Sequence, residues 1–121
     1  MIGVWTRLND SLALQTATVN VSDTISGATG TFKVYKFGKV CTVVWSNING
    51  LNHASWASNS MIAYLPNGFR PKVEVSKDPL CGGGYAIIPG KLVFHTGGAI
   101  QVTSPNAITD ITNGNITYIT S

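Results

Sequence analysis

The side chains that most often carry enzymatic chemistry are few in this chain. Its 121 residues include five carboxylates, two histidines and two cysteines. No two carboxylates are spaced as an obvious acid–base pair, although folding could bring two together, and no Gly-x-Ser-x-Gly motif marks a nucleophilic serine. The carboxylates are Asp10, Asp23, Glu74, Asp78 and Asp110. This pattern predicts a protein that is not an enzyme.

The cysteines and histidines could in principle form a catalytic dyad or a zinc site. These residues are Cys41, Cys81, His53 and His95. They lack the short ligand spacing of a zinc motif, so we expect no metal and no cofactor. Because Cys41 falls in an apolar segment, a buried free thiol is the main interpretation, and a Cys41–Cys81 disulfide is the less favoured alternative. The run Gly82-Gly83-Gly84 lacks the Lys-Ser/Thr of a phosphate-binding loop, and we expect it to allow a bulge or a close backbone approach.

A polar loop with one large aromatic residue is the better candidate for function. Residues 52–59 carry amide and hydroxyl groups, one indole and no formal charge. Sugars bind in such settings, because their C–H faces stack on an aromatic ring while neutral polar groups satisfy their hydroxyls. We predict a saccharide site formed by His53, Trp56 and Asn59, with Trp56 as the stacking platform. The alternative is that Trp56 packs on the core and the polar residues are only solvated.

Composition indicates an all-β chain. Hydrophobic residues make up 44% and charged residues 11%, with many β-branched residues and many Gly, Asn and Ser turn formers. No segment keeps a 3.6-residue apolar period, so no long helix is expected. We predict a single domain over residues 1–121, with an N-terminal arm at residues 1–11. The expected fold is an antiparallel β-sandwich or jelly roll of about eight strands.

The positive charge is modest and does not indicate a polyanion partner. The net charge is +3, and the chain has only eight basic residues. Lys33, Lys36 and Lys39 form the one local cluster, on an expected hairpin where lysines commonly protect a sheet edge. No aromatic-basic motif accompanies them, so no nucleic-acid partner is expected. No apolar run approaches the roughly 20 residues of a membrane helix, and the N-terminus lacks a signal-peptide pattern, so we expect neither membrane insertion nor export.

Residues 39–47 are predicted to form a central strand. Cys41, Val43 and Trp45 share one face of it, and burial of Trp45 is expected. The opposite face is also largely apolar, so we expect this strand to be covered on both faces. Residues 47–60 and 77–84 are expected to be loops.

Two hairpins are predicted after residue 90. In residues 91–104, a three-residue turn at 96–98 places Leu92, Phe94, Ile100 and Val102 on one face and leaves His95 and Gln101 on the more polar face. A two-residue Gly97-Gly98 turn is the alternative, but it mixes polar and apolar residues on both faces. Asn113-Gly114 is a strong turn signal and predicts the second hairpin.

Residues 61–76 predict a tight corner between two strands. An apolar strand at 61–65 runs into Pro66-Asn67-Gly68, which suits a turn, and Phe69-Arg70-Pro71 leads into a strand at 72–76. This corner resembles one in the C-terminal head domains of tailed-bacteriophage receptor-binding proteins and tail fibres. Three other features of that family recur in the same order. They are Trp5-Thr6-Arg7 with Leu14-Gln15-Thr16, the segment YKFGKV at 35–40, and the late hairpin at 92–102.

The resemblance implies a homotrimer of β-sandwich or jelly-roll heads at the tip of a tail fibre or baseplate, within a virion assembled in the host cytoplasm. It implies attachment to a host cell-surface saccharide and contacts with other tail or baseplate proteins. It transfers no sugar-binding residue, because residues 65–71 are scaffolding in kind. Two alternatives stay open. One is a structural virion connector that binds only protein partners, and the other is a cellular trimeric β head that resembles a C1q-like domain.

Overall fold

The computed structural model describes residues 13–54, 60–83 and 86–120. The expected N-terminal arm, residues 1–11, lies outside them. Within the described ranges the chain forms eleven strands and one 3-10 helix, η1 (Val21–Asp23). The strands are β1 (Gln15–Asn20), β2 (Thr29–Phe37), β3 (Val40–Asn49), β4 (Met61–Tyr64), β5 (Val75–Lys77), β6 (Leu80–Gly83), β7 (Ala86–Pro89), β8 (Lys91–Phe94), β9 (Ala99–Thr103), β10 (Asp110–Ile111) and β11 (Gly114–Ile119). The all-β prediction is confirmed, with more strands than the eight or so expected.

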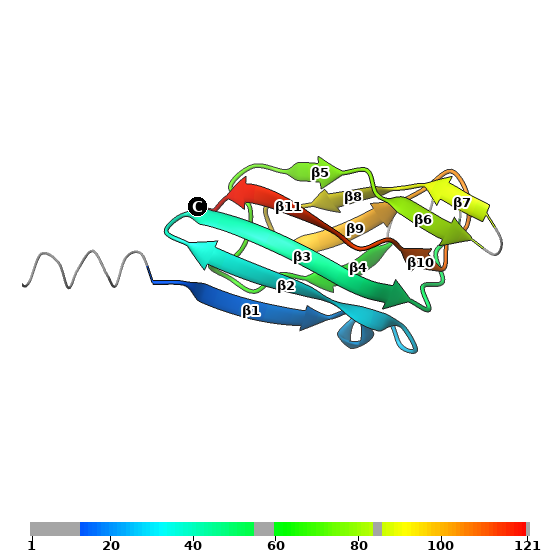
Figure 1. Ribbon diagram of the computed structural model, residues 1–121, viewed down its shortest axis with the longest axis horizontal. Coiled ribbons are helices and arrows are strands. Elements are labelled where there is room, and N and C mark those ends of the chain that lie inside the picture. The colour runs from blue at the N-terminus through cyan, green and yellow to red at the C-terminus, as the bar shows by residue number, and fades with distance from the viewer. Residues whose placement is uncertain (1–12, 55–59, 84–85, 121) are drawn as a thin grey trace, which may run out of the picture.

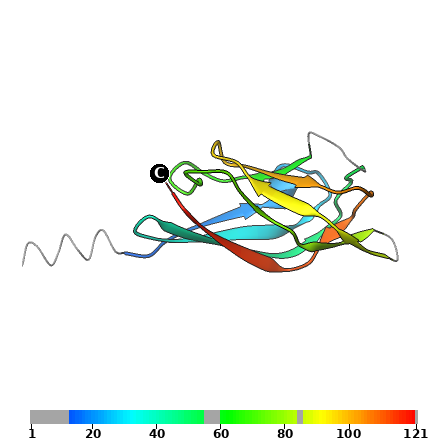
Figure 2. The same ribbon diagram turned by 90° about the horizontal axis from the view of Figure 1, so that it is seen from above.

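Two antiparallel sheets pack face to face (Figure 1). The larger sheet has seven strands in the order β1-β2-β3-β10-β6-β7, with β11 also paired to β3. The smaller sheet has four strands in the order β4-β9-β8-β5. Figure 2 shows the layers from above, with blue β1, cyan β2 and red β11 on one side and yellow β8 and orange β9 on the other. The architecture is therefore a β-sandwich.

β3 is the central strand of the larger sheet. β2 pairs along one of its edges, and β10 and β11 pair along the other. The inward residues Cys41, Val43 and Trp45 are at most 1% exposed, which confirms the predicted face. The outward residues Val40 and Val44 are 43% and 40% exposed, so the expectation that both faces are covered is wrong. Neighbouring strands cover both edges of β3, but the second sheet covers only one face.

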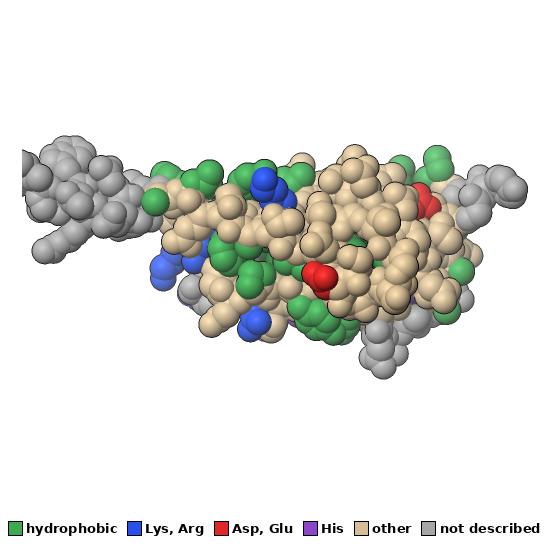
Figure 3. Space-filling model, turned by 90° about the horizontal axis from the view of Figure 1, so that it is seen from below, with side chains coloured by type: hydrophobic (Ala, Val, Ile, Leu, Met, Phe, Trp, Pro, Cys, Tyr) green, Lys and Arg blue, Asp and Glu red, His purple; other side chains and the backbone are tan. Residues whose placement is uncertain are grey.

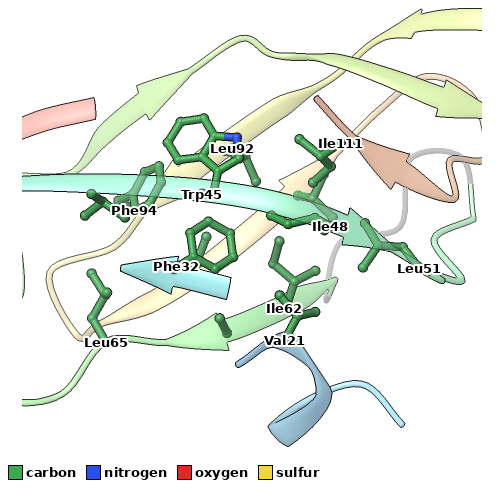
Figure 4. Close-up of a cluster of buried hydrophobic side chains, with 14 of the residues drawn as sticks. Val21, Phe32, Trp45, Ile48, Leu51, Ile62, Leu65, Leu92, Phe94 and Ile111 are labelled. Carbon is green, nitrogen blue, oxygen red and sulfur yellow. The ribbon is translucent and has the colours of Figure 1, made fainter. Parts of the chain in front are cut away.

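Three aromatic rings lie at the middle of the core (Figure 4). Phe32 and Trp45 come from the larger sheet and Phe94 from the smaller one. Ring centroids are 6.0 Å apart for Phe32–Trp45, 5.9 Å for Trp45–Phe94 and 6.3 Å for Phe32–Phe94. Tilted and edge-on pairs of this kind contribute roughly 0.5–1.5 kcal/mol each beyond the area they bury. The three rings therefore join the two layers directly.

The β8–β9 hairpin has the predicted register. Leu92 pairs with Val102 and Phe94 with Ile100, and all four side chains are fully buried. Gly98 closes the turn with φ +97°, a conformation that favours glycine. A slip of one residue would place polar and apolar side chains together on both faces, so the segregation of polarity was sufficient to predict the pairing.

The predicted turn at Pro66-Asn67-Gly68 is also present. Phe69 N donates to Pro66 O at 3.2 Å, and Gly68 has φ +93°. The strand before it, β4, ends at Tyr64, close to the predicted boundary. The strand after it begins later than predicted, because β5 starts at Val75.

The lysine cluster does not protect a sheet edge, contrary to the expectation from the sequence. Lys33 and Lys36 lie on β2, which is flanked by β1 and β3. The Nζ of Lys36 donates to Gly68 O at 2.7 Å and lies 5.7 Å from the centroid of the Phe69 ring. Lys36 therefore links the larger sheet to the corner that follows β4.

Asn113-Gly114 does not form the predicted hairpin. β10 and β11 pair with the same edge of β3 in one continuous register, with Ile111 opposite Ile48 and Gly114 opposite Trp45. The indole Nε1 of Trp45 donates to Thr112 O at 2.9 Å. A Cβ on Gly114 would lie 2.7 Å from Cζ2 of the same indole. Glycine at this position thus makes room for Trp45 and does not serve a turn.

The two expected loops contain strand pairing. Within residues 77–84, β6 pairs with β7 and β10, and a Cβ on Gly82 would overlap the carboxylate of Asp110. The expected close backbone approach is confirmed for Gly83, which lies against Ala107 O, whereas Gly82 lies against a side chain and Gly84 is outside the described residues. Within residues 47–60, β3 continues to Asn49, and His53 forms a bridge with Ile108.

Replacing Gly114 by alanine should lower the free energy of unfolding by about 1–3 kcal/mol, because the added methyl group overlaps the buried indole of Trp45. Urea denaturation followed by tryptophan fluorescence measures this change. Gly97→Ala is the matched control, since nothing lies within 4 Å of a Cβ there, and its effect should stay within about 0.5 kcal/mol. A Gly114→Ala protein as stable as the parent would contradict the packing of Trp45 on β11.

Candidate functional site

A cavity of about 210 Å³ opens beside His53. One wall is the chain that leaves β3, the other is the chain that enters β4, and the segment after η1 adds a third side. The lining residues are Ile25, Leu51, Asn52, His53, Ser60, Met61 and Ile62. Residues 55–59 connect the two main walls in sequence. The cavity therefore lies at the base of the loop that the sequence singles out for binding.

Main-chain pairing with a distant segment fixes the wall that carries His53. Leu51 N donates to Thr109 O at 2.8 Å, and His53 and Ile108 exchange two main-chain hydrogen bonds of 3.4 and 3.1 Å. Leu51 and His53 consequently point inward and are 3% and 5% exposed, while Asn52 between them is exposed. The extended, alternating backbone thus places an imidazole inside and an amide at the mouth of the cavity.

The His53 ring has one satisfied and one free hydrogen-bonding position. Its Nδ1 lies 2.6 Å from Ser60 Oγ, which joins the two walls. Its Nε2 is buried and has no hydrogen-bond partner among the residues that the structure describes. Burial lowers the pKa of His53, and the main chain of Ser104 raises it by a smaller amount. The imidazole is therefore neutral at neutral pH, and Nε2 can donate or accept one hydrogen bond according to the tautomer.

The lining combines neutral polar groups with apolar side chains. The imidazole, the Ser60 hydroxyl and the Asn52 amide supply donors and acceptors, and Met61 and Ile62 supply apolar surface. No carboxylate, lysine or arginine is among the lining residues. A buried polar atom without a partner is costly, so Nε2 favours a ligand or a water that can bond to it. The chemistry suits a small neutral polar group, such as a hydroxyl-bearing sugar.

Of the three residues predicted to form the saccharide site, only His53 is described, and it lines the cavity. Trp56 and Asn59 lie outside the described residues. The sequence did not single out Ser60, although it closed the predicted polar loop. The apolar contributors Ile25 and Ile62 come from segments that had no functional signal in the sequence.

The structure offers no nucleophile among its thiols. Cys41 and Cys81 are both free and buried, as the main sequence interpretation expected. Burial, with a smaller contribution from Asp110, raises the pKa of Cys81 to about 11, and burial also raises the pKa of Cys41. Both thiols are protonated at neutral pH, whereas nucleophilic and metal-binding cysteines act as thiolates. Across the described ranges, no three His, Cys, Asp or Glu side chains gather as a metal site.

Comparison with known proteins gives no family for this chain. No protein-family model matches it, and a search of curated proteins finds no similar sequence. Within the part of the chain that the structure describes, no helix is long and apolar enough to span a membrane.

Acid should destabilise the parent protein more than a His53→Gln variant. His53 titrates at its ordinary pKa of 6.5 when unfolded, and burial lowers its pKa in the folded chain. As the pH falls below 6.5 toward the folded pKa, the unfolded chain takes up the proton first, so folded-state stability decreases. The variant lacks this contribution, and every other ionisable group is common to the two proteins. Urea denaturation between pH 7.5 and 5 measures the difference, and a gap between the two proteins that did not change with pH would exclude a buried neutral His53.

Proposed function

We propose that this chain is the receptor-binding head domain of a phage tail fibre or baseplate, and that it attaches as a homotrimer to saccharide on the host cell surface. The observation that carries the binding proposal is the neutral polar cavity beside His53, where the described residues supply no hydrogen-bond partner for the buried Nε2. The order of the sequence motifs supports the phage assignment. The β-sandwich agrees with the fold that this resemblance implies.

The surface chemistry supports a neutral ligand. The residues that line the cavity carry no formal charge at neutral pH, given the lowered pKa of His53. Charged side chains are sparse on the face shown in Figure 3, where hydrophobic and polar atoms are interspersed. Attachment through such a surface depends on hydrogen bonds and stacking and should change little with salt.

The outer face of the larger sheet supports self-association. Val40 pairs with Phe37 on β2 and with Ile119 on β11, so three outward apolar side chains form a row across the sheet. They are 43%, 53% and 53% exposed, respectively. Beside this row, Val73 is 68% exposed and, with Ile119, lines a hollow of about 240 Å³. Contiguous exposed apolar surface of this kind commonly marks a protein interface.

A trimer would also explain how a small cavity could serve attachment. A site of about 210 Å³ is smaller than most ligand pockets, so its contacts with a sugar are few and individually weak. Three sites on one head act together, and avidity can exceed single-site affinity by roughly 10²–10⁴. Trimerisation and saccharide binding are therefore parts of one mechanism.

Trp56→Ala should reduce attachment of the labelled protein to host cells at least tenfold, because it removes the aromatic ring that the sequence predicts as the stacking platform. Flow cytometry across a panel of candidate host bacteria measures attachment, and raising the salt concentration should change it little. Ile87→Ser is the control, because it removes a 77% exposed apolar side chain on β7 that does not line the cavity. Equal attachment by Trp56→Ala and parent would remove this loop from the site. A parent that attaches to no host but binds a tail protein would favour the connector alternative.

The protein should be a trimer in solution, with about three times the chain mass of 12.8 kDa by light scattering. The double variant Phe37→Ser/Ile119→Ser should shift the mass toward the monomer while keeping the circular dichroism of the parent, because both side chains are exposed in the single chain. Leu80→Ser/Ile87→Ser is the matched control on β6 and β7 and should remain trimeric. A monomeric parent at high micromolar concentration would overturn the trimer.

A further inference from the structure

A chain of hydrogen-bonded side chains crosses the outer face of the smaller sheet. His95 Nδ1 lies 2.9 Å from Glu74 Oε1, and His95 Nε2 lies 2.8 Å from Gln101 Oε1. Glu74 directly precedes β5, His95 directly follows β8, and Gln101 is in β9. The side chains of His95 and Glu74 are 31% and 59% exposed. With both ring nitrogens engaged, the imidazole is held in one orientation at the surface.

Tyr64 lies on the same face, two strands away. β4 pairs Tyr64 with Ala99, and His95 N donates to Ala99 O at 2.9 Å across the hairpin. Tyr64 is 54% exposed, so its ring is available at the surface. Adjacent strands are about 4.8 Å apart, which places Tyr64 and His95 roughly 10 Å from each other with the small Ala99 side chain between them. An aromatic ring and a polar cluster thus lie on either side of Ala99 on the same face of the sheet.

We call Tyr64, Glu74, His95 and Gln101 the polar platform. One carboxylate oxygen of Glu74 bonds to His95, which leaves the other able to accept from a hydroxyl group. Tyr64 offers a ring face for the C–H groups of a sugar and a hydroxyl at its tip. The carboxylate disfavours an anionic ligand such as a phosphate, because like charges repel. The platform therefore fits a neutral saccharide.

The platform adjoins the cavity beside His53. Met61 lines that cavity, and it pairs with Gln101 of the platform across β4 and β9. We propose that the two form one extended site, which binds a neutral oligosaccharide of several sugar residues with one end at His53 and the other at Glu74 and His95. The proposal rests on the proposed function for the class of ligand, while the polar platform itself is a new element of the site. The distance across the sheet from β4 to the segment that precedes β5 is three strand spacings, or roughly 14 Å. This distance exceeds the length of a single sugar ring.

The test is NMR titration of isotope-labelled protein with defined neutral probes. The probes are the methyl glycosides of glucose, galactose and N-acetylglucosamine, together with maltohexaose and chitohexaose. The ring signals of His53 report on the cavity, and those of His95 and Tyr64 report on the platform. We expect a hexasaccharide to shift both sets of signals and to bind at least tenfold more tightly than its monosaccharide. Tyr64→Ala should bind the hexasaccharide and the monosaccharide with similar affinity. Tyr64→Phe, which keeps the ring, should retain most of the higher affinity for the hexasaccharide.

The outcomes separate this inference from the proposed function. Shifts at His53 alone, with equal affinity for monomer and hexamer, would overturn the extended site and leave saccharide binding at the cavity standing. Shifts at His95 and Tyr64 without His53 would overturn the extended site and the cavity, and would leave saccharide binding at the platform alone. If no probe shifted the signals of His53, His95 or Tyr64, both the cavity and the platform would be excluded as binding sites for these sugars. If Tyr64→Ala bound the hexasaccharides with the affinity of the parent, the platform would be excluded. The comparison is valid because an exposed side chain can be removed without loss of the fold.

Discussion

The packing of Trp45 between the two sheets is the constraint on which the rest of the structure depends. Its indole is 1% exposed and contacts rings from both layers, with centroids 6.0 Å from Phe32 and 5.9 Å from Phe94. A buried indole N–H needs an acceptor, and Thr112 O provides it at 2.9 Å. The segment that carries Thr112, between β10 and β11, must therefore run beside β3, and the glycine at position 114 leaves room for the ring. One side chain thus determines the depth of the core and the course of the C-terminal strand.

The elements that could be predicted from sequence are those in which neighbouring residues determine the structure. Alternation placed Trp45 inward, and separation of polar from apolar residues determined the register of Phe94 with Ile100. Asn113-Gly114 was predicted wrongly because a local turn signal was overridden by packing against a residue far away in sequence. The outward face of β3 was also predicted wrongly, because apolar composition cannot show whether a second layer or a partner will cover a sheet.

The candidate site was predictable in composition but not in geometry. The loop at 52–59 was identified because it is polar, uncharged and aromatic, and His53 does line a cavity. Its burial depends on the bridge to Ile108, and its fixed ring depends on Ser60. The cluster of Glu74, His95 and Gln101 forms only when β5 and the β8–β9 hairpin pair. Hydrogen bonds between such distant segments leave no periodic signal in the sequence.

The two outer faces of the sandwich differ in chemistry, and this difference makes the proposed assembly and the proposed binding compatible. The larger sheet presents Phe37, Val40 and Ile119 outward, whereas the smaller sheet presents Glu74, His95 and Gln101. The outer faces of a two-layer fold point in opposite directions. Copies that associate through the apolar face therefore leave the polar face open to solvent. In the proposed trimer, burial of the apolar row stabilises the assembly, and the polar platform stays accessible to the proposed saccharide.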